Sequence, residues 1–104
     1  GLFRMRDKDE MDEKVLCVPT SDPLYDGYDD IGDVPGHFLR EVEHFFTIYK
    51  DLEHVRVQAL GWEGDAAARS VIVEAMARYQ VKRQADALTE LAAKAAAERA
   101  GKEL

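Results

Sequence analysis

Two segments near the start of the chain have the apolar character of β-strands. Residues 2–6 (Leu-Phe-Arg-Met-Arg) alternate loosely between apolar and basic positions. Residues 14–19 include a second apolar run, which ends at Pro19 before a turn-rich stretch. We therefore predict a hairpin of two strands around a polar loop over residues 7–14. A long loop rich in Asp, Pro and Gly is expected over residues 20–33.

The middle of the chain shows a helical pattern followed by a short strand pattern. Apolar residues at three- and four-residue steps predict an amphipathic helix over about residues 35–50. Asp33 or a neighbour suits its cap, and Pro35 suits its first turn. The residues that carry this pattern are Phe38, Val42, Phe45, Phe46 and Tyr49. Alternation over residues 55–62 predicts a short strand, with Gly61 and Gly64 marking its end.

From Asp65, a plausible N-cap, the pattern predicts helix to near the end of the chain. Ile72, Ala75, Met76 and Tyr79 share one helical face, so this part is expected to pack on the body of the protein. The apolar pattern is weaker after Gln80. Residues 66–100 hold 13 alanines, which favour helix but bury little apolar surface. We therefore divide the chain into a body over residues 1–80 and an exposed helical extension over residues 81–104. The extension is a candidate for contact with a partner subunit.

Composition narrows the class of protein. With 104 residues, 34% of them charged, and a mean hydropathy of −0.39, the chain fits one soluble domain, and we expect a cytoplasmic location. No apolar run approaches the ~18 residues needed to span a bilayer. The net charge of −7 argues against nucleic-acid and membrane partners, which bind mainly through Lys and Arg. Cys17, inside an apolar run, is predicted to be a buried structural thiol.

Two polar groups are candidates for chemistry. Residues 7–14 include Asp7, Asp12 and Lys14, which suit a Mg²⁺ ion with a bound anion, although a solvated acidic face remains the alternative. Tyr49 and Lys50 end the predicted helix. Their simplest roles are ring packing for the tyrosine and compensation of the helix dipole for the lysine.

Three motifs, taken in order, resemble one known family. The first is the spacing Asp-x₄-Asp-x-Lys from Asp7 to Lys14, followed by residues 15–19 (Val-Leu-Cys-Val-Pro). The second is Tyr-Asp at residues 25–26 with Asp-Asp-Ile-Gly-Asp-Val-Pro at residues 29–35. The third is His-Phe-Phe at residues 44–46 with Tyr-Lys-Asp-Leu-Glu at residues 49–53. Together they are similar to the family I inorganic pyrophosphatases, most of all to the actinobacterial members, from residue 1 to about residue 79.

The resemblance implies a function, a fold and an assembly. It implies Mg²⁺-dependent hydrolysis of pyrophosphate to two phosphates by a metal-activated water. Asp7 and Asp12 would bind metal, whereas Lys14, Tyr49 and Lys50 would bind the phosphate groups of substrate and product. The implied fold class is α+β: part of an OB-like β-barrel, flanked by helices, with the long C-terminal helix added. Bacterial members usually assemble as hexamers.

The sequence also departs from the family pattern. The family motif Asp-x-Asp-Pro-x-Asp, which supplies further metal ligands and the catalytic base, does not precede this segment. The similar run at residues 22–26 lies in the loop after the second predicted strand, so we assign it no such role, and we assign no catalytic base. We expect the chain to be the C-terminal portion of a longer protein, inactive until the missing half is supplied.

Two other hypotheses compete with the enzyme. One is a non-catalytic interaction module that keeps the pyrophosphatase scaffold and uses the helical extension to form oligomers. The other is an OB-type binder of nucleic acid, which fits poorly because such proteins need a basic groove and this chain is acidic. Retention of all five candidate site residues favours the enzyme for the parent protein.

Overall fold

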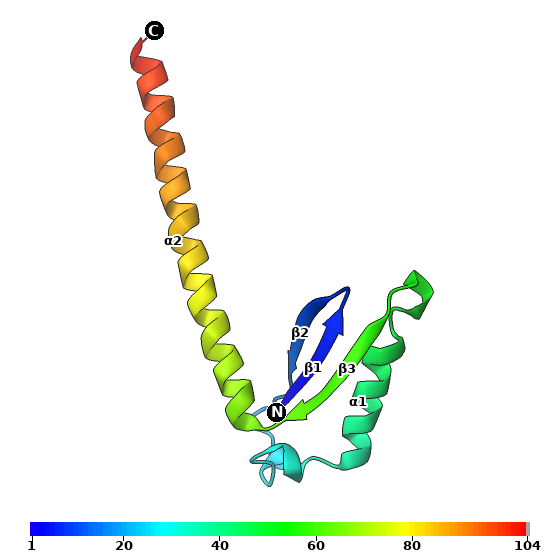
Figure 1. Cartoon of the computed structure of the whole chain (residues 1–104). Helices are drawn as coiled ribbons and strands as arrows, with labels where there is room; N and C mark the ends of the chain where they lie inside the picture. Colours follow the sequence, from blue (N-terminus) through cyan, green and yellow to red (C-terminus); the bar gives the residue numbers. More distant parts are fainter. Residues whose placement is uncertain (104) are drawn as a thin grey trace. The chain divides into compact units, whose positions relative to one another are not determined.

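The computed structural model describes the backbone of residues 1–103 and the side chains of residues 1–101. Its strands are β1 (Leu2–Asp7), β2 (Glu10–Val15) and β3 (Val57–Glu63), and its α-helices are α1 (Gly36–Ile48) and α2 (Asp65–Glu103). Single turns of 3₁₀ helix lie at Pro23–Tyr25, Ile31–Asp33 and Asp51–Glu53. The strands form an antiparallel sheet in the order β2-β1-β3 (Figure 1). The predicted α+β class is confirmed.

The hairpin is tighter than the sequence indicated. Only Lys8 and Asp9 lie between β1 and β2, and both have positive φ angles of 50° and 64°. Such a two-residue turn matches the twist of the flanking strands. The predicted loop over residues 7–14 is therefore wrong, because most of it belongs to the two strands. The second strand ends at Val15 instead of reaching Pro19.

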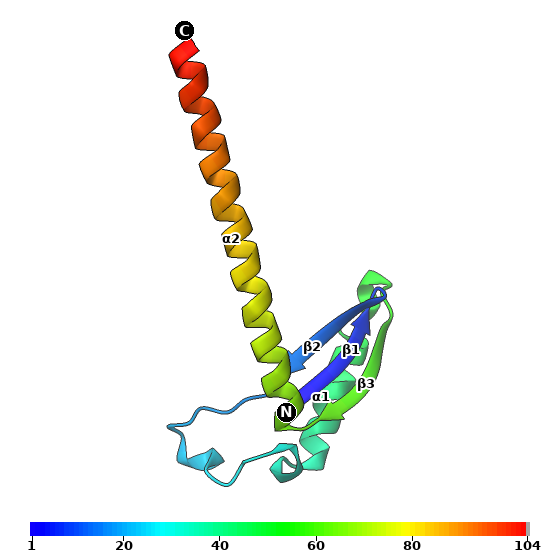
Figure 2. The same cartoon turned by 60° about the vertical axis from the view of Figure 1, so that its left-hand side comes forward.

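Aromatic packing joins the sheet to α1. Phe3, on the central strand, is fully buried. Its ring centroid lies 5.9 Å from that of Phe46 on α1 and 5.1 Å from that of Trp62 on β3. Figure 2 shows α1 running along one face of the sheet beside β3. Helix α1 is therefore fixed to the same sheet face that carries Phe3, and the residues just after its C-terminal end are placed by this packing.

The segment between β2 and α1 is irregular, and Cys17 within it is exposed. The prediction of a buried thiol at Cys17 is wrong. The apolar run around this residue continues past the end of β2, so it does not lie in a strand interior. Pro35, expected in the first turn of the helix, instead takes the N-cap position of α1.

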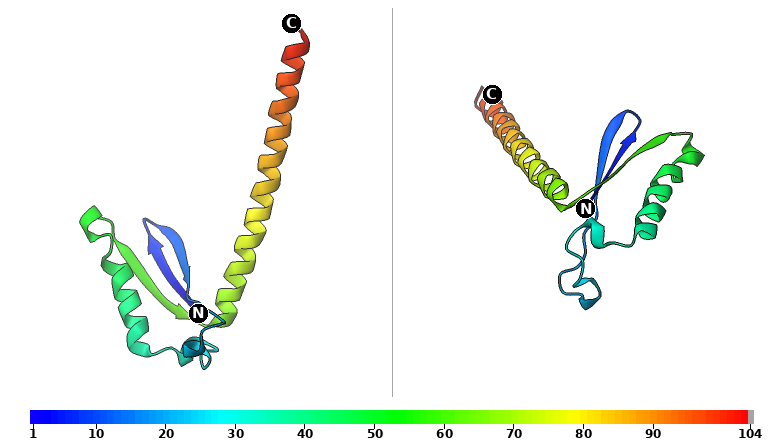
Figure 3. Two further views of the ribbon diagram at one scale, coloured as in Figure 1. Left: turned by 180° about the vertical axis from the view of Figure 1, so that it is seen from behind. Right: turned by 60° about the horizontal axis from the view of Figure 1, so that its bottom comes forward.

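Helix α2 begins at Asp65, as the pattern predicted, and it forms one uninterrupted helix in both views of Figure 3. A first compact unit ends at Val71, and a second unit begins at Ile72. Within the second unit, the side chains of Ile72, Met76 and Tyr79 are 43%, 63% and 60% exposed.

No helix in the described part of the chain is both long enough and apolar enough to cross a membrane.

Candidate functional site

The hairpin register gathers acidic and basic side chains on one face of the sheet. Strand β1 pairs with β2 so that Asp7 lies opposite Glu10, Met5 opposite Asp12, and Phe3 opposite Lys14. Side chains of directly opposed residues point to the same face, and so do alternate residues along a strand. The two candidate metal ligands therefore share the face that α1 covers, close to the turn of the hairpin.

Asp7 meets Lys50 across a sequence separation of 43 residues. Lys50 follows the C-terminal end of α1, and its Nζ donates a hydrogen bond to Oδ2 of Asp7. This hydrogen bond raises the pKa of Lys50 above its ordinary value of 10.5, and partial burial opposes the shift. The Asp7 side chain is only 13% exposed. Its other oxygen, Oδ1, is buried and has no hydrogen-bond partner among the described residues.

Asp12 and Lys14 form a second ion pair on the neighbouring strand. Nζ of Lys14 lies 3.0 Å from Oδ2 of Asp12, which is the arrangement expected for residues two apart on one strand face. The same Nζ lies 5.4 Å from the centroid of the Phe46 ring. A cation at this distance from an aromatic face is attracted by its negative potential. Helix α1 thus helps to hold Lys14 beside Asp12.

Tyr49 lies next to this group. Its ring packs on Phe45 and Phe46, with centroid distances of 5.6 Å and 5.5 Å. Nζ of Lys50 lies 5.5 Å from the centroid of the Tyr49 ring. The packing role that the sequence suggested for this tyrosine is present, and its 38% exposure also leaves part of the side chain open to solvent.

An open pocket of about 520 Å³ is lined both by candidate carboxylates and by the lysine that follows α1. Its lining includes three of the predicted site residues, Asp7, Asp12 and Lys50. Sequence analysis missed Lys8, Glu10 and Met11, which also line it. Alternation along β2 was the signal for Glu10, because it lies two residues before Asp12 on the same strand. No group of three or more potential metal-binding side chains gathers anywhere in the described residues.

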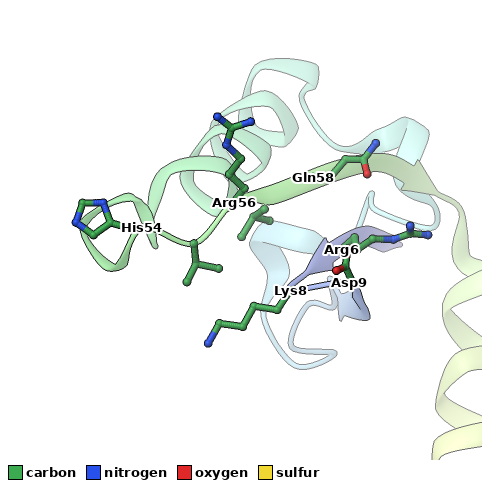
Figure 4. Close-up of a pocket in the computed structure, with 8 residues that line it drawn as sticks. Arg6, Lys8, Asp9, His54, Arg56 and Gln58 are labelled. Carbon is green, nitrogen blue, oxygen red and sulfur yellow. The ribbon is translucent and has the colours of Figure 1, made fainter.

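A second pocket, of about 670 Å³, lies beside the hairpin turn and the start of β3. Its charged lining is mainly basic, with Arg6, Lys8 and Arg56 against one carboxylate from Asp9. Figure 4 shows that the charged ends of Lys8 and Arg56 and the ring of His54 point in different directions. Because these groups do not converge, we do not assign this pocket as the functional site.

Two carboxylates of the Asp-rich loop have structural partners instead. Oδ1 of Asp30 accepts hydrogen bonds from the backbone N–H groups of Ile31, at 2.7 Å, and Asp65, at 2.8 Å. These bonds lower the pKa of Asp30 below its ordinary value of 3.8. Oδ2 of Asp33 accepts from the backbone N–H groups of Asp29 and Asp30, which lowers its pKa in the same way. Both side chains therefore fix the loop, and Asp30 joins it to the start of α2.

Comparison with known proteins gives one consistent result. The profile of the inorganic pyrophosphatase family matches residues 1–80. An inorganic pyrophosphatase of Methanosarcina acetivorans is 45% identical over 82 residues, which cover 79% of this chain and 49% of that protein. One of Geobacillus stearothermophilus is 44% identical over 79 residues, 76% of this chain and 48% of that protein.

The comparison of folds agrees with the comparison of sequences. The crystal structure of inorganic pyrophosphatase from Thermus thermophilus matches 76% of this chain and 47% of that one, with a TM-score of 0.72 and 36% identity. The chain spans about half the length of the curated relatives it matches. By the extent of the profile match and the agreement of sequence and fold, the chain belongs to the inorganic pyrophosphatase family.

Proposed function

We propose that this chain supplies part of the active site of an inorganic diphosphatase, which hydrolyses pyrophosphate to two phosphates with Mg²⁺. One observation carries the proposal. Oδ1 of Asp7 is buried without a partner, and Asp7 lines a pocket together with Asp12 and Lys50. A buried carboxylate oxygen without a partner is costly, so its presence argues for a ligand.

The donor set fits a magnesium ion. Mg²⁺ prefers oxygen ligands and is usually held by one or two carboxylates, with water and substrate phosphates completing its octahedron. Asp7 and Asp12 supply two such carboxylates on one sheet face. When bound, the metal would neutralise pyrophosphate and lower the pKa of a coordinated water so that it can attack phosphorus.

The cations of the site suit the phosphate groups. Lys14 and Lys50 now balance the charges of Asp12 and Asp7. In the proposed enzyme their ammonium groups bind phosphate oxygens and offset the charge that develops there during transfer. Tyr49 is held beside Lys50 by its ring packing, and its phenol would donate a hydrogen bond to the same phosphate group.

The two described carboxylates are fewer than a several-metal site needs, and no residue of the chain is assigned as the base. We therefore propose that residues outside this chain complete the cage. We further propose that residues 1–80 form the C-terminal portion of an OB-like barrel and residues 81–104 a helical extension. The whole enzyme would be a cytoplasmic hexamer, a proposal that rests on the family resemblance.

A chimera tests this function directly. The half of the Methanosarcina acetivorans relative that this chain does not match would be fused to residues 1–104, and phosphate release from pyrophosphate would be measured with Mg²⁺. We expect turnover in the chimera and a loss of about a hundredfold or more in Lys50→Met, which removes a phosphate-binding charge. Asp12→Asn should abolish the response to Mg²⁺.

Asp9→Asn is the matched control. Asp9 carries the same charge on the same hairpin but does not line the pocket, and asparagine tolerates its positive φ of 64°. This variant should keep its activity. A chimera that folds, as judged by cooperative unfolding, yet releases no phosphate with Mg²⁺ would contradict the proposed function.

A further inference from the structure

The second unit of the chain carries an exposed apolar seam. Within α2, Val81, Ala85, Leu88, Ala92 and Ala95 follow one another at steps of four, three, four and three residues. This is the spacing of the core positions of a coiled coil. Val81 and Leu88 are each 68% exposed, and the three alanines are also exposed.

The order of side chains along the seam distinguishes two ways of pairing with an identical helix. In a parallel pair each core residue meets its own copy, so Leu88 would face Leu88 and Ala85 would face Ala85. The helix separation would then have to be wide at one layer and narrow at the next. Packing at even separation needs a large side chain opposite a small one.

An antiparallel pair meets that requirement at each central layer. In one register Val81 lies opposite Ala92 of the second copy, and Ala85 lies opposite Leu88 of the second copy. The twofold axis repeats both layers, giving four consecutive layers that each combine one branched side chain with one alanine. Alanine in half of the core positions lets the two helices approach closely, and Leu91 covers the edge of the seam.

The charges along the helix favour the same direction. Residues 78–83 carry three cations and no acid, whereas residues 86–98 carry three acids and one cation. Parallel pairing would place each charged block against its own copy. Antiparallel pairing in this register places Arg78 opposite Ala95 of the second copy, about one helical turn from its Glu98, at both ends of the seam. It also opposes the two helix dipoles.

We propose that residues 78–98 of α2 dock antiparallel against the same segment of a second copy of this chain. The occupant of the exposed seam is thus a second pyrophosphatase chain, and the contact is isologous, with a twofold axis between residues 86 and 87. This inference is independent of the proposed catalytic function, because it uses no residue of the catalytic site.

Cysteine cross-linking tests the register on the full chain. Cys17 is exposed, so it is first replaced in a Cys17→Ser background. A Val81→Cys chain and a differently tagged Ala92→Cys chain are mixed and treated with a short thiol cross-linker. We expect the mixed product to dominate over both homodimers. If homodimers of Val81→Cys dominate instead, the helices pair in parallel and the proposal is overturned.

The second test measures self-association by sedimentation equilibrium. Leu88→Lys should weaken the dimer by about a hundredfold or more. Because the contact is twofold symmetric, the substitution removes a buried leucine from each of the two helices. Ala97→Lys, at an outer position of the same helix, is the matched control and should leave the association unchanged. A Leu88→Lys chain that associates as tightly as the Ala97→Lys chain, or mixed chains that give no cross-linked product, would refute the docking.

Discussion

Replacing Phe3 by alanine should remove a large part of the stability of the first unit. Phe3 is 0% exposed and packs on Phe46 and Trp62. It therefore contributes contacts both to α1 and to β3, in addition to the ladder between β1 and β3. The contact with α1 sets the position of Lys50, because Lys50 follows the end of α1 and reaches back to Asp7 on the strand.

The magnitude follows from the burial. A buried Phe→Ala substitution costs about 3–5 kcal/mol, and two aromatic pairs place this site toward the upper end. Proteins are stable by roughly 0.05–0.15 kcal/mol per residue, so a unit that ends at Val71 should have about 4–11 kcal/mol in total. A loss of ~4 kcal/mol lowers the ratio of folded to unfolded chain by roughly a thousandfold, since each 1.4 kcal/mol is about a factor of ten.

Urea unfolding followed by tryptophan fluorescence measures this loss. Trp62 is the single tryptophan and touches Phe3, so its emission reports on the sheet and not on α2. With a slope near about 1 kcal/mol per molar, the midpoint should fall by about 4 M, or the variant should be unfolded without urea.

Phe45→Ala is the control for this measurement. Phe45 lies on α1 beside Phe46 but is 55% exposed, so its truncation should cost less than about 1.5 kcal/mol. If Phe3→Ala costs no more than Phe45→Ala, the proposed core is not what holds α1 to the sheet.

The remaining predictions concern titration and reactivity. Backbone hydrogen bonds from Ile31 and Asp65 lower the pKa of Asp30, so its contribution to stability is present above pH 3.8 and is lost as pH falls through the folded value. Asp30→Asn should therefore flatten acid unfolding below about pH 4, as followed by fluorescence. The pKa of Lys50 is raised, so its contribution is complete below pH 10.5 and is lost above it; Lys50→Met should reduce the alkaline loss of stability. Exposed Cys17 should react fully with a chromogenic disulfide reagent in the native state, and slow reaction that needs urea would contradict the observed exposure.

The two α-helices of the fold could be predicted from the sequence. Helix α1 spans Gly36–Ile48 against a prediction of about 35–50, and α2 begins at the predicted Asp65. Both carry a pattern over many residues, which averages out local exceptions. Asp7 and Lys50 were assigned to one site by family resemblance, and the structure brings them into contact.

The hairpin and the Asp-rich loop were harder, for identifiable reasons. On one side of β2, Asp12 and Lys14 form the site, and on the other side Glu13, which pairs with Arg4 at 3.0 Å, stands between the apolar Met11 and Val15. Glu13 interrupts the alternation of apolar and polar residues, so the segment resembled a polar loop. In the loop over residues 20–33, sequence alone does not show that Asp30 is bonded to backbone N–H groups.

The central claim is that Asp7, Asp12, Lys14, Tyr49 and Lys50 form a metal-dependent site for pyrophosphate. The most direct test is isothermal titration calorimetry of pyrophosphate into the 104-residue chain, with and without Mg²⁺. We predict binding that requires Mg²⁺, is weakened in Asp12→Asn and Lys50→Met, and is unchanged in Asp9→Asn. Binding of equal strength without Mg²⁺, or binding that neither substitution alters, would contradict the claim.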